Sequence, residues 1–216
     1  MQDKIVKKSA VIIDGGYLRK VYEEQLHTML TASRVVEIGT KILTDYEELF
    51  RIYYYDCQPF EKELNTPISG NRFSNPNLIH QMKTLFSQIS TSDLIAFRSG
   101  KLKFGGWGLK ENVLQSLMVN PRPPNPLTDN DFRPMFKQKG TDMKIGLDIA
   151  WLSIRKIVDR IILVAGDADF VPAMKLARVE GVQIILVPFQ NVNQEIKEHS
   201  DELRILNLQT LLNCDQ

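Results

Sequence analysis

The segment from Arg160 to Pro188 reads RIILVAGDADFVPAMKLARVEGVQIILVP. It opens with an apolar run that ends at Gly166 and closes with a second run, Val182 to Val187, that ends at Pro188. Short β-branched runs bounded by glycine or proline are typical of buried strands. The apolar positions between the two runs recur with a helical period and stop at Gly181, a typical C-terminal glycine. The stretch therefore predicts a strand, a helix and a parallel strand.

Two further apolar runs extend this pattern into a sheet. Ala10 to Ile13 is followed by Asp14-Gly15-Gly16, and a run from Leu49 to Tyr55 ends at Asp56. Strands buried on both faces belong to parallel sheets that carry helices above and below. We therefore predict the α/β class, as a three-layer α/β/α sandwich with a central, mainly parallel sheet. Helices are expected over residues 33–48, 76–90 and, from the apolar stripe, about 145–156.

The length of 216 residues favours one large domain. We predict a single domain over residues 1–216, interrupted by a variable insertion at residues 57–135. Within the insertion, residues 94–104 are expected to form a strand, and the glycine-rich residues 105–108 a turn, in the manner of a hairpin. The proline-rich residues 120–126 are expected to form a loop, because proline interrupts both helices and central strands.

Composition excludes several classes of protein. The 27 Lys and Arg residues balance 26 Asp and Glu residues, which excludes a generally basic surface but not a local basic patch. The two cysteines, Cys57 and Cys214, form no CxxC pair, which argues against a zinc ribbon or a disulfide framework. No apolar run approaches the length of a membrane span, and the first twenty residues do not resemble a signal peptide. We therefore expect a cytoplasmic protein without a membrane partner.

Acidic residues gather where the predicted strands end. Asp14 ends the first strand, Asp167 and Asp169 follow the strand that begins near Arg160, and Asp142 lies with Asp148 at the start of the preceding helix. Ligands of open parallel sheets bind at the carboxyl ends of the strands. Carboxylates brought together there repel one another unless a cation lies between them. Oxygen ligands without His or Cys suit Mg²⁺ or Mn²⁺, which promote phosphodiester hydrolysis.

A structural explanation competes with this one. A single Asp after a strand often only caps the next helix, and for Asp14 alone that explanation is the better one. The pair Asp167 and Asp169 is harder to explain in this way, because one cap needs one Asp. No P-loop, GxSxG or HExxH motif is present to support an NTPase, a serine hydrolase or a zinc protease.

The segments that carry these acids resemble the NYN domain family, which includes the LabA-like proteins and belongs to the PIN-like nuclease superfamily. The resemblance covers residues 9–56 and 137–189 and is carried by the segments Val11–Leu18, Lys139–Asp142, Leu147-Asp148 and Val164–Phe170. It implies a PIN-like sandwich and a metal-dependent ribonuclease site in which the metal is bound by Asp14, Asp142, Asp167 and Asp169. Asp148 is added because it precedes Asp167 by nineteen positions, which is similar to the spacing in toxin-type PIN domains.

The function predicted from residues and resemblance together is a divalent-metal-dependent ribonuclease that acts on single-stranded RNA. The predicted catalytic and metal-binding residues are Asp14, Asp142, Asp148, Asp167 and Asp169, with Mg²⁺ or Mn²⁺ as the cofactor. The alternative is a non-catalytic module that binds RNA or a nucleotide and retains the acids. Tyr17 favours that alternative slightly, because many family members have Asn at this position. A homo-oligomer is left open.

Two smaller features complete the interpretation. Basic and aromatic residues mix in one segment that either holds single-stranded RNA or forms an exposed hairpin anchored by its aromatic residues. Its members are Arg98, Lys101, Lys103, Trp107 and Lys110, and the anchors of the hairpin would be Trp107 and Phe104. Asp56 is predicted to be a solvated turn residue, and Cys57 a buried small side chain.

Overall fold

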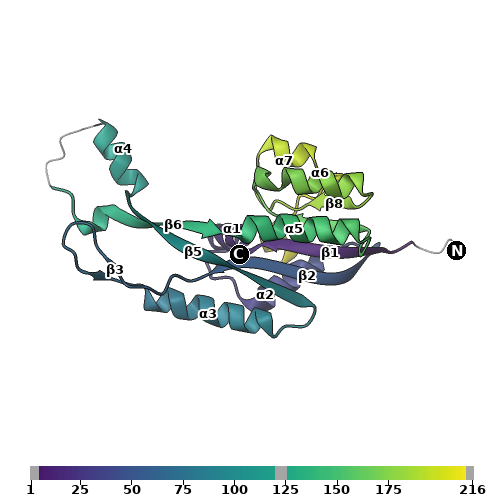
Figure 1. Ribbon diagram of the computed structural model, residues 1–216, viewed down its shortest axis with the longest axis horizontal. Coiled ribbons are helices and arrows are strands. Elements are labelled where there is room, and N and C mark those ends of the chain that lie inside the picture. The colour runs from purple at the N-terminus through teal and green to yellow at the C-terminus, as the bar shows by residue number, and fades with distance from the viewer. Residues whose placement is uncertain (1–4, 120–125, 213–216) are drawn as a thin grey trace.

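A computed structural model describes residues 5–119 and 126–212 of the chain (Figure 1). Most of the predicted proline-rich loop, and Cys214, lie outside the described residues. The main sheet has seven strands in the order β6-β5-β2-β1-β7-β8-β9. They are β1 (Lys7–Asp14), β2 (Glu47–Gln58), β5 (Ile95–Leu109), β6 (Phe132–Lys139), β7 (Arg160–Val164), β8 (Gln183–Leu186) and β9 (Glu202–Leu203).

Every neighbouring pair in this sheet is parallel except β5 and β6. The short strands β3 (Leu64–Asn65) and β4 (Arg72–Phe73) form a separate antiparallel pair. The helices are α1 (Gly15–Leu26), α2 (Ala32–Lys41), α3 (Pro76–Ser90), α4 (Glu111–Val119), α5 (Thr141–Ile154), α6 (Val171–Val179), α7 (Gln194–Glu198) and α8 (Leu208–Leu211). Two 3-10 turns, η1 (Asp129–Asp131) and η2 (Ala168–Phe170), complete the elements.

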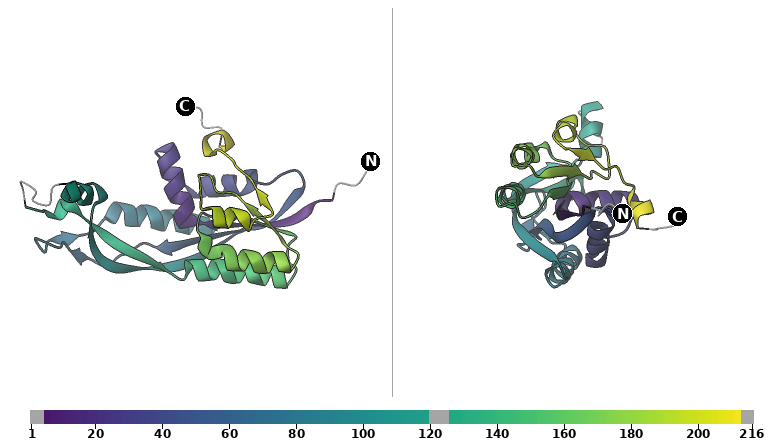
Figure 2. Two further views of the ribbon diagram at one scale, coloured as in Figure 1. Left: turned by 90° about the horizontal axis from the view of Figure 1, so that it is seen from above. Right: turned by 90° about the vertical axis from the view of Figure 1, so that its right-hand side faces the viewer.

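Two apolar cores lie on opposite faces of the sheet, because successive side chains of a strand point to opposite sides. In β1, Val11 and Ile13 pack with α1, α2 and α3, whereas Ala10 and Ile12 pack with α5 and α6. All four side chains are fully buried. Figure 2 shows the sheet edge-on, with helices on both sides of it. The predicted three-layer α/β/α sandwich with a mainly parallel sheet is confirmed.

Several predicted elements appear with the expected bounds. The unit β7–α6–β8 occupies the stretch from Arg160 to Pro188, and Gly181 follows α6 with a positive φ of 82°. The helix predicted over residues 76–90 is α3, and the side chain of Asn75 caps it by accepting a hydrogen bond from the backbone N–H of Leu78. Within the described ranges, no helix is long and apolar enough to cross a membrane.

Two predicted boundaries are wrong. The helix expected over residues 33–48 stops at Lys41, because β2 begins at Glu47, opposite Lys7 of β1. The glycine-rich residues 105–108 are not a turn but lie inside β5. The pairing of β5 with β6 shifts its register between Phe104 and Trp107, and Gly106, which lies in this interval, adopts a positive φ of 104°. An irregularity of this kind is a usual place for glycine within a strand.

Strand β5 pairs with a different strand over each half of its length. Ile95 to Lys101 pairs in parallel with β2, and Lys101 to Leu109 pairs antiparallel with β6. We call the second part, together with β6, the β5–β6 arm; Figure 1 shows it reaching past α5 towards α4. Both α3 and β5 belong to the range 57–135, whose status as a variable insertion stays a prediction.

Candidate active site

An open cleft of about 910 Å³ lies where the carboxyl ends of the central strands meet the starts of the following helices. Asp14, Asp142 and Asp167 all line it, although they come from three different elements. The other side chains on its walls are basic, amide and aromatic groups, among them Lys20, Lys137, Gln138, Tyr17, Gln190, Asn191 and Asn193. The topology of the sheet therefore brings three of the five predicted acids to one place.

Asp14 is the last residue of β1 and caps α1 by accepting a hydrogen bond of 3.1 Å from the backbone N–H of Tyr17. Burial raises the pKa of the Asp14 carboxyl to about 6, although the bond from Tyr17 works in the opposite direction. The negative charges of Asp142 and Asp56 add to the increase. Asp14 therefore has a structural role as a helix cap. Its carboxyl also lines the cleft, where burial and the neighbouring negative charges make ionisation unfavourable.

Asp142 lies in the first turn of α5 and is exposed. Gly140, with a φ of 85°, lets the chain pass from β6 directly into this helix. Burial raises the pKa of the Asp142 carboxyl, and the charges of Asp167 and Asp169 raise it further. These carboxylates are therefore close enough to repel one another.

Asp167 and Asp169 have different roles in the turn after β7. Asp167 caps η2, since its carboxylate accepts a hydrogen bond of 3.0 Å from the backbone N–H of Asp169. Asp167 lines the cleft; Asp169 is not among the lining residues and influences the cleft through its charge on Asp142. Tyr17 packs so closely against this turn that a Cβ on Gly166 would lie 2.5 Å from its ring.

Asp148 lies apart from the cleft. Its carboxylate accepts a hydrogen bond of 2.6 Å from the hydroxyl of Tyr55 and pairs with Arg98 at 3.2 Å. Arg98 in turn lies over the ring of Tyr53. Asp148 thus joins α5 to β2 and β5, and these contacts engage the side chain in the packing of the sandwich.

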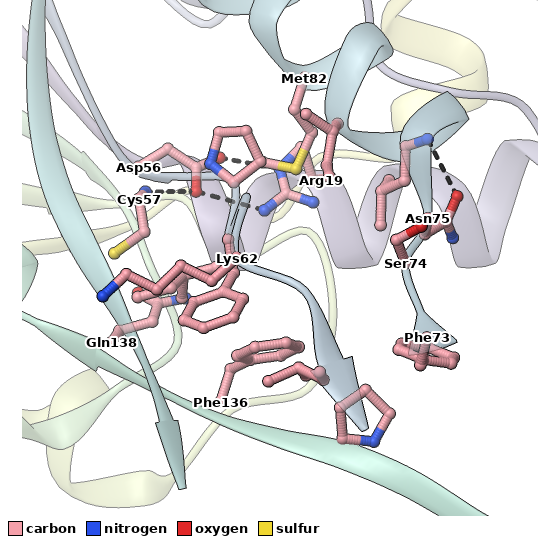
Figure 3. A pocket seen from close by; sticks show the side chains of 17 residues that line it. Arg19, Asp56, Cys57, Lys62, Phe73, Ser74, Asn75, Met82, Phe136 and Gln138 are labelled. Carbon is pink, nitrogen blue, oxygen red and sulfur yellow. Dashed lines mark hydrogen bonds and ion pairs between the residues drawn. The ribbon is translucent and has the colours of Figure 1, made fainter. Parts of the chain in front are cut away.

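The expectation that Asp56 is a solvated turn residue is wrong. Its side chain is 1% exposed, and both carboxylate oxygens bind Arg19 of α1, at 2.8 and 3.2 Å. The hydroxyl of Tyr54 and the backbone N–H of Cys57 also donate to it. Figure 3 shows this ion pair at one side of a second, smaller pocket. Cys57 is buried, as predicted.

A row of lysines that the acid pattern does not reveal lies beside the cleft. Lys101 is directly opposite Lys139, and Lys103 is directly opposite Lys137, on the two strands of the arm. Residues two apart along a strand share a face, so the four ammonium groups lie on one face of the arm. All four are exposed, and within the described part of the chain none forms an ion pair. The signal was visible as two Lys-x-Lys pairs, Lys101–Lys103 and Lys137–Lys139.

Two other members of the basic and aromatic segment are engaged in the fold. Arg98 is paired with Asp148. Trp107 donates a hydrogen bond of 2.9 Å from Nε1 to the carbonyl of Asn65 and meets the ring of Phe73 edge-on at 5.1 Å. Trp107 therefore anchors the β3–β4 hairpin on the arm, in line with the structural alternative for this aromatic residue.

The acidic cleft carries donors of the kind that bind divalent cations. Its acidic groups are all hard oxygen donors, and their mutual repulsion is the kind that a cation relieves. Among residues 5–119 and 126–212, however, no three His, Cys, Asp or Glu side chains come close enough to bind one ion together. The donor chemistry of Asp14, Asp142 and Asp167 fits Mg²⁺ or Mn²⁺, and an ion at this site would take water as part of its coordination, as Mg²⁺ commonly does.

The fold and the cleft define an α/β sandwich with carboxylates at the carboxyl edge of a mainly parallel sheet. Residues 109–207 match the NYN domain family, so the chain carries an NYN domain over this range. The match includes Asp142, Asp148, Asp167 and Asp169; it does not include Asp14, and the resemblance over residues 9–56 stays a prediction.

Comparison with curated proteins gave no match. Among solved structures, the chain is similar to a protein of unknown function from Vibrio parahaemolyticus. The two share 16% identity with a TM-score of 0.49, over 96% of this chain and 97% of the other.

Proposed function

We propose that the chain is a divalent-metal-dependent ribonuclease and that the acidic cleft is its active site. The observation that carries the proposal is that Asp14, Asp142 and Asp167 line one cleft from three separate elements. The NYN domain over residues 109–207 supports a PIN-like nuclease. In this proposal Asp169 acts through its charge on Asp142, and Asp148 supports the packing of α5.

In this proposal the acidic residues of the cleft bind the metal ion, and its lysine and amide side chains position the substrate. Asp14, Asp142 and Asp167 would hold Mg²⁺ or Mn²⁺ partly through water molecules, since no three such side chains among the described residues are close enough to bind one ion directly. When bound, such an ion neutralises phosphate charge and makes water more acidic. Lys20 and Lys137 line the same cleft and are placed to attract the phosphate of the substrate. The amide groups of Gln190, Asn191 and Asn193 offer neutral hydrogen bonds around it.

The lysine face of the arm supports RNA as the substrate. Like charges directly opposite each other on a sheet destabilise it. The pairs Lys101–Lys139 and Lys103–Lys137 are therefore a cost to the fold, and a polyanion bound across them would reduce that cost. Lys137 belongs to both the face and the cleft, so a phosphate chain that follows the arm arrives at the acids. A homo-oligomer stays an open prediction.

A specific observation favours a second candidate function. Since no three potential ligands within the described ranges are close enough to share a metal ion, the cleft also suits a module that binds RNA without cleaving it. Such a protein would use the lysine face and the amide groups, and its acids would serve as helix caps, as Asp14 and Asp167 do.

One experiment separates the two candidates. The purified chain is incubated with end-labelled single-stranded RNA in Mn²⁺ or in EDTA, and binding and cleavage are measured in parallel. The ribonuclease predicts Mn²⁺-dependent fragments that disappear in Asp14→Asn and Asp167→Asn but persist in the control Asp93→Asn, which changes an exposed carboxylate in the turn before β5. Binding without fragments would contradict the ribonuclease and support the binding module.

A further inference from the structure

A second pocket, of about 290 Å³, lies between α3, the segment after β2 and the arm. Most of its wall is apolar, and the rings of Phe60 and Phe136 stand beside each other with centroids 5.2 Å apart. Leu78 and Met82 contribute from α3. Figure 3 shows Phe136 facing the space that Arg19, Asp56 and Lys62 border from the other sides. The pocket therefore combines an aromatic wall with a group of polar atoms.

The polar atoms left for a ligand in this pocket are mainly hydrogen-bond donors. Asp56 has no acceptor to spare, because Arg19, Tyr54 and Cys57 already donate to its two oxygens. Arg19 uses Nε and one terminal nitrogen for Asp56, and its other terminal nitrogen has no partner among the residues described. The oxygen of Asn75 is occupied by the N–H of Leu78, so its NH₂ group remains as a donor.

Lys62 adds a positive charge to the same pocket. It is exposed and forms no ion pair within the ranges that the structure covers. A planar ligand with acceptor oxygens and a nearby negative charge would satisfy such a lining: its ring would stack on Phe136, and its oxygens would accept from Arg19 and Asn75. A nucleobase attached to its phosphate has these properties, and stacking on aromatic side chains is a general way to hold unpaired bases.

The pocket and the acidic cleft share one lining residue. Gln138 lines both spaces. Along β6, Phe136 and Gln138 face the pocket side of the arm, and Lys137 and Lys139 belong to the lysine face. A single strand with a phosphate in the cleft therefore has a place for a neighbouring base next to it.

We propose that this pocket receives one unstacked nucleobase of the RNA strand and favours bases that carry carbonyl oxygens, such as uracil. The proposal rests on the proposed function for the identity of the strand, but base binding in the pocket is measurable without any cleavage. It gives the protein a means of positioning a substrate relative to the cleft that does not depend on the acids.

The test measures binding of uridine 5′-monophosphate to the full chain in EDTA, by calorimetry and by saturation-transfer NMR. Ribose 5-phosphate, which lacks the base, is the control ligand. We expect saturation of the uracil protons and at least tenfold tighter binding of the nucleotide. Adenosine 5′-monophosphate, which has no carbonyl oxygen, is expected to bind more weakly. Equal binding of the two nucleotides would overturn the preference for carbonyl oxygens.

Two variants place the ligand in the pocket. Phe136→Ala removes the stacking ring and is expected to weaken nucleotide binding about tenfold. Leu78→Trp fills the pocket from an exposed position of α3, 41% accessible, and is expected to abolish binding without unfolding the chain. Trp151→Ala removes an exposed aromatic side chain of α5 and serves as the matched control. Binding that is unaffected by Leu78→Trp would overturn the proposal.

The outcomes also separate this proposal from the proposed function. Nucleotide binding should survive in Asp14→Asn, because that residue does not line the pocket. Cleavage of RNA by a chain that does not bind uridine 5′-monophosphate would overturn the base pocket alone. Base binding without any cleavage of RNA would overturn the ribonuclease alone. If the apolar probe N-acetylphenylalaninamide binds in the pocket and neither nucleotide does, the pocket is a site for a protein side chain and the proposal is overturned.

Discussion

The hydroxyl of Tyr55 donates a hydrogen bond of 2.6 Å to Asp148, and this bond connects the centre of β2 to α5. Tyr55 is fully buried, so its hydroxyl depends on the carboxylate for a partner. The contact gives Asp148 a structural task that is separate from the cleft. It also supplies a way to distinguish a structural acid from a catalytic one.

We expect Asp148→Ala to lower the free energy of unfolding by about 2 kcal/mol, because it leaves a buried hydroxyl without an acceptor. In the double variant with Tyr55→Phe, most of this loss should disappear, since neither partner is then left unsatisfied. Urea denaturation of the two single variants and the double variant measures the coupling. RNA cleavage should persist in Asp148→Ala and be strongly reduced in Asp142→Asn; the reverse order would return Asp148 to the catalytic set.

Metal binding should appear as added stability, because an ion that binds only the folded chain stabilises it by RT ln(1 + [L]/Kd). We expect millimolar Mn²⁺ to raise the melting temperature of the wild-type chain and of Asp93→Asn, and to have little effect on Asp167→Asn. Without metal, Asp142→Asn should melt at a higher temperature than wild type near pH 7, because the variant removes a carboxylate that its neighbours repel. A melting temperature that does not respond to Mn²⁺ would count against the site.

Glu47 provides a prediction about pH that is independent of the cleft. Burial alone would raise the pKa of its carboxyl, but hydrogen bonds from Arg204, the backbone of Thr44 and Arg160 outweigh burial and hold the pKa at about 2. A lowered pKa stabilises the fold above the ordinary value of 4.5, and this contribution is lost as the pH falls towards 2. The loss amounts to about 3 kcal/mol.

Acid denaturation followed by circular dichroism checks this prediction. Glu47→Gln should be less stable than wild type at pH 7 and should lose less stability between pH 4.5 and 2. Glu48→Gln, at the exposed neighbouring position, is the control and should follow wild type. Parallel acid curves for Glu47→Gln and wild type would show that the ion pairs contribute no pH dependence.

The lysine face should control the salt dependence of RNA binding. Each phosphate contact to a single strand contributes about −0.7 to the slope of log K against log salt, so Lys103→Gln with Lys137→Gln should flatten the slope by about 1.4. The same double variant should be slightly more stable without RNA, because one cross-strand repulsion is removed. Arg155→Gln with Lys175→Gln, two exposed positions away from the arm, is the matched control. An unchanged slope would exclude this face as the RNA contact.

The sequence predicted secondary structure correctly where a segment's structure depends mainly on residues close to it in the chain. The stretch from Arg160 to Pro188 gave the correct order of elements because both apolar runs are buried on two faces and end at strong breakers. The cap of α3 at Asn75 was predictable for the same reason. Residues 105–108, in contrast, contain three glycines, which normally indicate a turn. They form part of a strand because they pair with β6, which lies about thirty residues later in the sequence.

The candidate site was predictable only in part. The carboxyl ends of the strands brought Asp14 and Asp167 together as expected, because the sheet topology follows from the buried runs. Asp56 was misjudged because its partner, Arg19, lies 37 positions earlier and the sequence gives no sign of that pairing. Asp142 and Asp148 are six residues apart on one helix, and side chains at that spacing point about 120° apart, so only Asp142 reaches the cleft.

Because β5 pairs with β2 over one half and with β6 over the other, the length of the arm can vary without a change in the acidic cleft. The half of β5 that pairs with β2 is fixed in the sandwich, whereas the half that pairs with β6 ends far from the acids. Residues added to both strands at the far end would lengthen the arm without moving Gly140 or Asp142. Because the added residues would lie beyond Leu109 and Phe132, the lysine face of the arm and the opposite, aromatic face would stay unchanged next to the cleft. The length of the arm can therefore change while the same two faces are presented to a substrate.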